Sequence, residues 1–348
     1  MERIQGLTEY IRTEGYRQAL GLPKEVTEGY RMLAQGEYNI NYMFTHPVTG
    51  KELLLRVNCG SQMHLEDQIG YEYLALKILE DSGRTPEAVY VDGSRRHLNH
   101  GVMVMEYLPG RALDYHRDMK LAAEILADVH STKVPGNRIP LREADGSGRG
   151  TLICPENPLQ AILEECEQMV KTYMESSLGD ADTKRQIRKM LDAGWEKVKE
   201  FGCQKTYRCC INTELNSTNF LINGQGKKNY LIDWEKPLYG DPAQDLGHFL
   251  APTTTFWKTD VILNKPQMDA FLDEYIRRVN GRFPTGGLRE RTAVFVPVTC
   301  LRGVTWCAMA WVEYQQPDKL IFNESTFRKL DAYLDREFLR DLHLHFLS

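Results

Sequence analysis

The chain has 348 residues, of which 42% are hydrophobic and 26% are charged, and its formal net charge is −5. This length and composition predict a soluble globular protein built as one two-lobed unit or as two packed domains. The negative net charge provides no basic field, which argues against a nucleic-acid partner.

The N-terminal residues and the apolar segments argue against a membrane protein. Residues 1–6 are polar and lack the apolar stretch of a signal peptide. The longest apolar tract, residues 293–312, is interrupted by Pro297 and Arg302. Eight scattered cysteines form no C-x-x-C pair, so we expect buried free thiols in a reducing compartment. We therefore expect a cytoplasmic protein without a membrane partner.

The first hundred or so residues predict a small lobe of strands and one central helix. An amphipathic helix is expected over residues 7–20, where Gly21 and Pro23 follow. The expected strands are residues 30–33, 40–45, 52–57 and 102–107, with a helix over residues 66–79 and a loop near Asp92 and Gly93.

After Pro109 and Gly110 the pattern becomes helical. The expected helices are residues 119–131, 158–173, 183–201, 268–279, 290–314 and 325–343. A charged, glycine-rich loop from Arg142 to Pro155 separates the first two. The chain is therefore expected to divide at a hinge near residue 108, into an N-terminal lobe of residues 1–108 and a C-terminal lobe of residues 109–348.

One core strand of the first lobe carries a charge that needs a partner. Arg56 lies among apolar neighbours in residues 53–57. On the predicted helix over residues 66–79, Glu72 falls within the apolar stripe, three residues after Ile69 and four before Leu76. Buried charges are costly unless they are paired, so Arg56 and Glu72 are expected to pair. The pair can serve to bind an anion, or it can be purely structural.

A short hairpin in the second lobe gathers oxygen donors. Residues 220–222 and 230–232 are apolar, and the turn sequence Asn-Gly-Gln-Gly lies between them. If these runs pair antiparallel, Asn219 and Asp233 become neighbours with Cα atoms about 5 Å apart. An amide oxygen beside a carboxylate suits Mg²⁺. Glu214, five residues before Asn219, adds a third oxygen donor, as expected for phosphoryl transfer.

This part of the chain resembles the aminoglycoside phosphotransferase and choline kinase family. The family pattern is roughly H-G-D-x-x-x-x-N, a hairpin, then I-D-W/F-E and G-D-P-x-x-D-L. Residues 232–235, Ile-Asp-Trp-Glu, and residues 240–246, Gly-Asp-Pro-Ala-Gln-Asp-Leu, match it. Asn212 stands where the family has His, and Glu214 stands where it has the catalytic Asp.

The resemblance implies an α+β, two-lobed protein kinase-like fold that uses ATP and Mg²⁺. The small lobe would hold an antiparallel sheet and one helix, and the larger lobe would be mostly helical. The implied base is Glu214, and the implied Mg²⁺ ligands are Asn219 and Asp233. Asp245 would brace the catalytic loop by accepting backbone N–H bonds. Glu235 could contact metal or substrate, or could serve as a brace.

The resemblance also assigns nucleotide contacts to the first lobe. Arg56, held in place by Glu72, would bind the phosphates. The backbone of Glu106 and Leu108 would bind the adenine edge. The turn that contains Gly36, Asn39 and Asn41 is similar to the family's phosphate loop, although one glycine alone is more typical of an ordinary hairpin.

The function implied is transfer of the γ-phosphoryl group of ATP to a hydroxyl of a small polar metabolite or aminoglycoside-like compound. The alternative is a nucleotide-binding pseudokinase with a regulatory or scaffolding role. Acidic residues on two predicted helices could face a cationic amine, but such runs are usually solvated helix faces: Glu164, Glu165, Glu167, Asp273 and Glu274. The sequence identifies neither the acceptor nor an oligomeric state.

Overall fold

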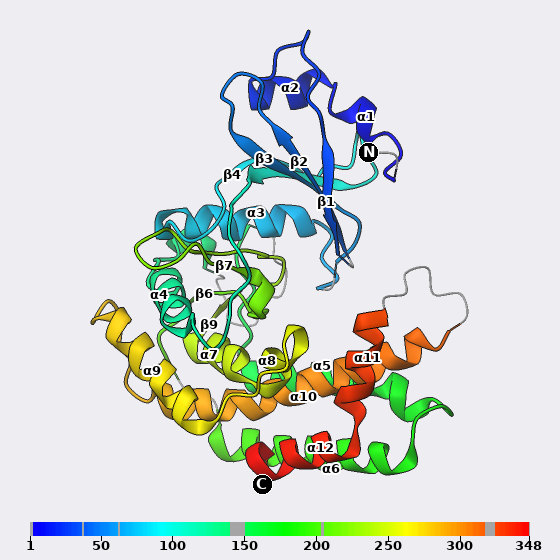
Figure 1. Cartoon of the computed structure of the whole chain (residues 1–348), viewed down its shortest axis with the longest axis vertical. Helices are drawn as coiled ribbons and strands as arrows, with labels where there is room; N and C mark the ends of the chain where they lie inside the picture. Colours follow the sequence, from blue (N-terminus) through cyan, green and yellow to red (C-terminus); the bar gives the residue numbers. More distant parts are fainter. Residues whose placement is uncertain are drawn as a thin grey trace.

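The computed structural model describes residues 3–36, 38–61, 63–139, 150–202, 205–316 and 324–347. Glu37 of the predicted phosphate loop, residues 142–149 of the predicted glycine-rich loop, and Cys203 lie outside this set. Two lobes are visible in Figure 1, with the small sheet-containing lobe above and the helical lobe below.

A five-stranded antiparallel sheet forms the small lobe. Its strands are β1 (Arg31–Gln35), β2 (Asn39–Thr45), β3 (Glu52–Asn58), β4 (Ala88–Asp92) and β5 (Gly101–Glu106), in the order β1-β2-β3-β5-β4. Helices α1 (Leu7–Tyr10) and α2 (Glu14–Leu20) share a hydrophobic core with one face of the sheet. Helix α3 (Gln68–Leu79) packs on the other face and faces the larger lobe (Figure 1).

The period of two along β3 explains why Arg56 lies on the face of the sheet that packs against α3. Leu53, Leu55 and Val57 point into the core with α1 and α2. Leu54 and Arg56 point to the opposite face, where Leu54 packs into the core that contains α3. The charged side chain therefore projects toward the helix that carries Glu72.

The small lobe differs from the sequence-based expectation in three places. Residues 88–92 form β4, where only a loop near Asp92 was expected, because their short apolar run pairs with the long apolar strand β5. The expected helix over residues 7–20 is two helices, because Thr13 has an extended backbone with ψ of 145°. Helix α3 begins two residues later than expected, where the Asp67 side chain accepts a hydrogen bond from the Gly70 N–H at 3.0 Å.

The larger lobe is mostly helical. Its longer helices are α4 (Met119–His130), α5 (Pro158–Glu175), α6 (Ala181–Phe201), α7 (Pro242–Leu250), α9 (Lys265–Val279), α10 (Leu288–Tyr314) and α11 (Glu324–Leu334). The shorter α8 (Pro252–Lys258) and α12 (Arg336–Leu342) complete it, with a π-helical turn at His343–Leu347. The expected helix over residues 325–343 is divided at Asp335, which caps α12. Helices α7 and α8 were not predicted.

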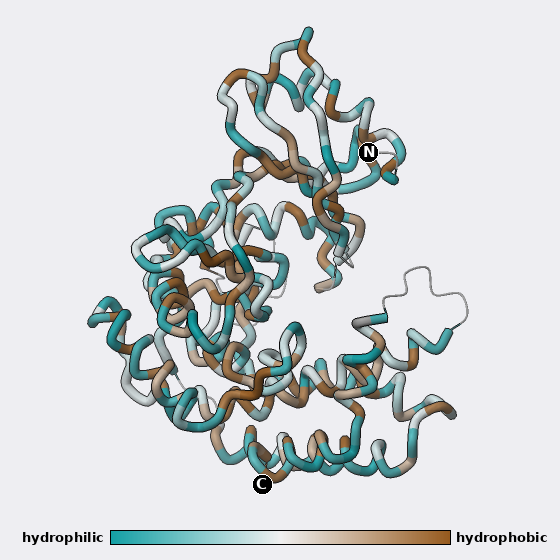
Figure 2. The backbone as a smooth tube through the Cα atoms, in the orientation of Figure 1, coloured by the Kyte–Doolittle hydropathy of each residue, from teal (hydrophilic) through white to brown (hydrophobic). Residues whose placement is uncertain are grey.

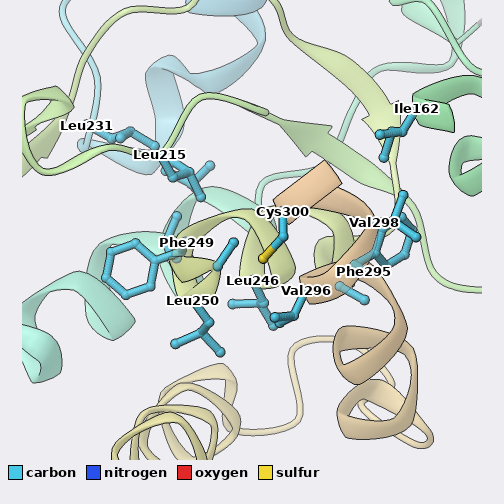
Figure 3. Packing of buried hydrophobic residues seen from close by; sticks show 14 of the residues in the cluster. Ile162, Leu215, Leu231, Leu246, Phe249, Leu250, Phe295, Val296, Val298 and Cys300 are labelled. Carbon is cyan, nitrogen blue, oxygen red and sulfur yellow. The ribbon is translucent and has the colours of Figure 1, made fainter. Parts of the chain in front are cut away.

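Helix α10 is the centre of this lobe. It packs against α5 and α7, and its side chains Val296 and Cys300 lie beside Leu246 and Leu250 of α7 (Figure 3). It is long and apolar enough to cross a membrane, but 67% of its most apolar stretch is buried inside the protein. By contrast, the outer helix α6 is mostly hydrophilic (Figure 2).

The cysteines follow the expectation with one exception. None of the seven in the described residues forms a disulfide; six are buried and Cys59 is exposed. Because burial raises the pKa of the Cys209 and Cys210 thiols, these side chains stay protonated and act as small apolar residues.

Candidate functional site

The segment that carries Glu214 is fixed by α7 and by its own first residue. It follows β6 (Cys209–Ile211), which pairs with β9 (Leu238–Gly240). The buried Asp245 carboxylate accepts hydrogen bonds from the backbone N–H groups of Asn212 and Thr213, at 2.8 and 2.7 Å. Asp245 therefore has the bracing contacts that the family resemblance implies. Its third partner is the buried His130, whose Nε2 lies 3.1 Å from Asp245 Oδ2.

Asn212 connects the loop of Glu214 to the end of the hairpin. Its side-chain oxygen accepts a hydrogen bond from the Glu214 N–H at 3.0 Å, and its Nδ2 donates to the Asp233 carbonyl at 2.8 Å. A neutral amide is sufficient for both contacts. Asn212 can therefore form them at the position where the family pattern has His. Asn212 was noted in the sequence only as a departure from that pattern.

The hairpin register differs by one residue from the expected one. Strand β7 (Phe220–Leu221) pairs with β8 (Tyr230–Leu231) so that Phe220 lies opposite Leu231. The Ile232 N–H consequently donates to the Asn219 carbonyl at 2.8 Å, and Asn219 lies opposite Ile232 instead of Asp233. The expected register was wrong because the apolar runs were aligned end to end, whereas Ile222 leaves the hairpin and bridges Arg111.

Backbone geometry and hydrogen bonds orient the two predicted metal ligands. Asp233 lies two residues beyond the end of β8 and has a positive φ of 65°, so its side chain is not held to the alternation of the strand. Asn219 donates from Nδ2 to the Glu214 carbonyl at 2.7 Å, which leaves its oxygen as the free end of the amide. A carboxylate and an amide oxygen are hard donors and fit Mg²⁺.

Arg56 is held by three side chains. Its Nε donates to the Asn41 side-chain oxygen at 3.1 Å, and its Nη1 pairs with Glu72 and lies 3.3 Å from Asp233 Oδ1. Burial alone would lower the pKa of Arg56, but the charges of Glu72 and Asp233 outweigh it and raise the pKa. The expected pair of Arg56 and Glu72 is present, and it lies beside the hairpin acid.

Three carboxylates, those of Glu72, Asp233 and Glu235, lie near the single positive charge of Arg56. Burial raises the pKa of Glu72 to about 7, against the opposing effect of Arg56. Burial and the charges of Asp233 and Glu72 raise the pKa of Glu235 to about 8. Glu235 accepts a hydrogen bond from Asn39 Nδ2 at 2.5 Å, so it contacts the turn between β1 and β2.

The remaining predicted nucleotide contacts lie at the rim of the sheet. The Gly36 N–H donates to the Asn39 carbonyl at 2.9 Å and closes the turn between β1 and β2. The Asn39 side chain is buried, and its oxygen accepts a hydrogen bond from Asn58 at 2.9 Å. Glu106 ends the interior strand β5, and the buried Leu108 follows it as the chain leaves for the larger lobe.

Glu214 belongs to a cluster of four charges, two acidic and two basic. The Glu214 carboxylate is 3.6 Å from Arg302 Nη2 and 4.0 Å from Lys236 Nζ. Both cations also bind Glu165 of α5, with Arg302 Nε at 3.0 Å and Lys236 Nζ at 3.3 Å. The pKa of Glu165 falls to about 2, because the Arg302 and Lys236 charges overcome the effect of burial.

Sequence reasoning missed the two cations of this cluster. Lys236 directly follows the matched Ile-Asp-Trp-Glu segment, and Arg302 is the single charge in the apolar tract of residues 293–312. Both features are visible in the sequence. Arg302, however, was considered only as evidence against a membrane span. Among the acidic residues considered for an amine, Glu165 alone joins this cluster. The others pair elsewhere: Glu164 with Gln160, Glu167 with Arg188, Asp273 with Arg289, and Glu274 with Arg277 and Arg278.

A small pocket of about 100 Å³ opens beside the cluster. Its polar lining includes Glu165, Lys236 and Arg302, together with Thr213, His248 and Gln244. The His248 Nδ1 accepts the Leu215 N–H at 3.1 Å. Burial, with the nearby charges of Arg302 and Lys236, lowers the pKa of His248 to about 3, so the ring is neutral and carries its proton on Nε2.

Comparison with known proteins places this arrangement in a family. The family model described as the phosphotransferase enzyme family matches residues 29–290, about three quarters of the chain. No curated protein sequence matches the chain.

Similar solved structures extend over nearly the whole chain. A spectinomycin phosphotransferase bound to ADP and spectinomycin has a TM-score of 0.64 at 13% identity, and the match covers 99% of this chain and 98% of that one. A choline kinase from Cryptosporidium parvum has a TM-score of 0.64 at 14% identity, with 98% of each chain covered. An ethanolamine kinase from Plasmodium vivax has a TM-score of 0.62 at 16% identity, with coverage of 97% and 94%. At these identities the likeness shows the fold.

Proposed function

The chain belongs to the phosphotransferase enzyme family, ATP-dependent enzymes that phosphorylate hydroxyl groups of small molecules, and from this premise we propose roles for its site residues. Glu214 orients the acceptor hydroxyl and receives its proton. Arg56 binds the nucleotide phosphates, and Asn219 and Asp233 hold Mg²⁺. The observation that carries the proposal is the position of the Asn212 side chain, which forms hydrogen bonds with the Glu214 N–H and the Asp233 carbonyl.

The geometry supports these roles because hydrogen bonds to neighbouring residues orient the functional groups of Arg56 and Asn219. Glu72 and Asn41 orient the guanidinium of Arg56, which offers a rigid, permanently charged fork to phosphate oxygens. Asn219 presents its oxygen because its Nδ2 is engaged by the Glu214 carbonyl. Mg²⁺, when bound there, would neutralise charge on the phosphates. The backbone of Gly36, Glu106 and Leu108 is proposed to contact the nucleotide, while Asn39 supports the site by holding Glu235.

The transfer itself exchanges one oxygen for another on phosphorus. The acceptor oxygen forms the new bond, the bond between the γ-phosphorus and the bridging oxygen of ADP breaks, and the hydroxyl proton passes to Glu214. Glu214 carries its carboxylate one methylene farther from the backbone than Asp would. The Asn212 contact to its own N–H supplies the local positioning that this longer side chain needs.

A thermal-shift titration tests the nucleotide and metal roles. ATP, GTP and ADP are each titrated with and without Mg²⁺, on the wild type, Asp233→Ala and the exposed control Asp273→Ala. We expect saturable stabilisation of the wild type and of Asp273→Ala that depends on Mg²⁺. Asp233→Ala should lose the dependence on Mg²⁺. A folded wild type that no nucleotide stabilises would overturn the proposal.

A further inference from the structure

The charges around Glu214 indicate which charge on an acceptor the site favours. Its nearest cations, Lys236 and Arg302, lie where an incoming hydroxyl compound must be seated, within 4.0 Å of the Glu214 carboxylate. Both are largely buried, with 11% and 16% of the side chain exposed. Arg302 projects from the apolar core helix α10, where an unpaired charge would be strongly destabilising.

The carboxylates of the cluster are already engaged. Glu165 Oε2 accepts from Arg302 Nε at 3.0 Å, and Glu165 Oε1 lies within 3.4 Å of both Arg302 Nη2 and Lys236 Nζ. A cationic amine placed here would lie beside two cations and would have to displace one of them from its partner. The cluster therefore does not favour an amine.

Hydrogen-bond donors, however, remain available at the pocket. Within the described residues, Arg302 Nη1 has no hydrogen-bond partner, and Lys236 uses one of its three N–H groups, toward Glu165. His248 lines the same pocket and, with Nδ1 accepting the Leu215 N–H, has an Nε2–H to donate. Three donors with spare capacity, two of them cationic, match a group that is rich in acceptor oxygens.

We propose that the acceptor is a hydroxyl compound that carries an anionic group, a carboxylate or a phosphate ester, and that Arg302, Lys236 and His248 bind this group beside Glu214. This assignment rests on the proposed function, because it takes Glu214 as the base. The pocket of about 100 Å³ accommodates one such small group, while the acceptor hydroxyl lies at Glu214.

Four compounds with one three-carbon skeleton test the charge preference: glycerate, glycerol 3-phosphate, glycerol and 3-amino-1,2-propanediol. Binding and ATP-dependent phosphorylation are measured with the full-length wild type. We expect glycerate or glycerol 3-phosphate to have a kcat/KM at least tenfold above glycerol, with the amine lowest. Which of the two anions is preferred separates a carboxylate from a phosphate ester. Equal or better use of the amine or of glycerol overturns the proposal.

Binding outcomes separate this inference from the proposed function. A protein that binds nucleotide with Mg²⁺ but neither binds nor phosphorylates any of the four compounds refutes the anion site and leaves the nucleotide roles intact. A folded protein without nucleotide binding refutes the proposed function itself.

Substitution of Arg302 tests the contact directly. Arg302→Gln should raise KM for the anionic acceptor 10- to 100-fold with KM for ATP unchanged, and Arg302→Lys should restore part of the loss. If Arg302→Gln does not fold, the double variant Glu165→Gln/Arg302→Gln removes both charges of the pair and keeps the measurement possible. Arg289→Gln, an exposed position on the same helix, is the matched control. An unchanged KM for the anion in the Arg302 variants would contradict the proposal.

Discussion

At the residue scale, the most informative position is Glu214. Its backbone N–H is bonded to Asn212, and its carboxylate lies near two cations. Glu214, whose side chain is longer than the Asp of the family pattern, is therefore held through both its backbone N–H and its carboxylate. The two departures from the family pattern, Asn212 and Glu214, lie in direct contact and act together.

Replacement of the Glu214 carboxylate should remove turnover but not nucleotide binding. Glu214→Gln keeps the shape and loses the proton acceptor, so we expect kcat to fall by about 10²- to 10⁴-fold. Steady-state kinetics and a nucleotide titration measure the two effects. Glu164→Gln, on the exposed face of α5, is the control. Full activity in Glu214→Gln would show that another group is the base.

Glu235 should make stability depend on pH. Its pKa is raised from 4.5 to about 8 by burial and by the charges of Asp233 and Glu72. The folded protein therefore binds this proton more tightly than the unfolded chain does. The stabilisation is fully present below pH 4.5, is lost as the pH rises toward about 8, and does not change further above it.

Glu235→Gln mimics the protonated acid and should remove this dependence. We expect the variant to be more stable than the wild type at pH 8.5, by about 1–3 kcal/mol, and to differ little at pH 4.5. Chemical denaturation at several pH values gives the difference. A stability difference that does not vary with pH would contradict the raised pKa.

At the element scale, the close contact of α7 with α10 supports the loop that carries Glu214. Helix α7 carries Asp245, which holds the loop, and Gly247, which faces α10. A Cβ at Gly247 would lie 2.3 Å from the Cβ of Phe295 and 2.9 Å from its backbone carbon. Only glycine lets the two helices approach this closely.

Gly247→Ala should therefore force α7 away from α10. We expect the free energy of unfolding to fall by about 1–3 kcal/mol from overpacking, together with reduced kcat because Asp245 moves with the helix. Urea denaturation and steady-state kinetics measure both effects. Gly15→Ala, in helix α2 with no atom within 4 Å of the new Cβ, should leave stability equal or slightly increased. Equal behaviour of the two variants would argue against this packing.

At the scale of the whole molecule, helix α3 joins the two lobes. Its residues lie in the same hydrophobic core as α4, α7 and α10. The Tyr71 hydroxyl donates to the Pro237 carbonyl at 2.6 Å and accepts the Ile153 N–H at 3.0 Å. Gln68 donates to the Glu235 carbonyl at 2.7 Å. The helix that holds Arg56 through Glu72 is thus bonded to the segment that follows Asp233.

Loss of the Tyr71 hydroxyl should weaken this junction. Tyr71→Phe leaves a carbonyl and an N–H without their partner, so we expect about 1–3 kcal/mol of destabilisation. Denaturant unfolding measures the loss, and Tyr73→Phe on the partly exposed side of the same helix is the control. If both variants unfold at the same denaturant concentration as the wild type, the Tyr71 contacts contribute no stability.

The sequence by itself determined the features that local pattern controls. The apolar run around Arg56 predicted a charge in a core strand that needs a partner. The helical period placed Glu72 within an apolar stripe, and the pattern of residues 212–246 predicted the loop and hairpin. These relations follow from periods of two and 3.6 residues and from turn residues, which act over short stretches of chain.

Only the tertiary structure decided the relations between distant segments. The hairpin register depends on the bridge between Ile222 and Arg111, and β4 depends on its pairing with β5. The cluster beside Glu214 joins Glu165, Lys236 and Arg302 from three separate elements. No local period relates such residues, because their proximity results from the packing of α5 against α10.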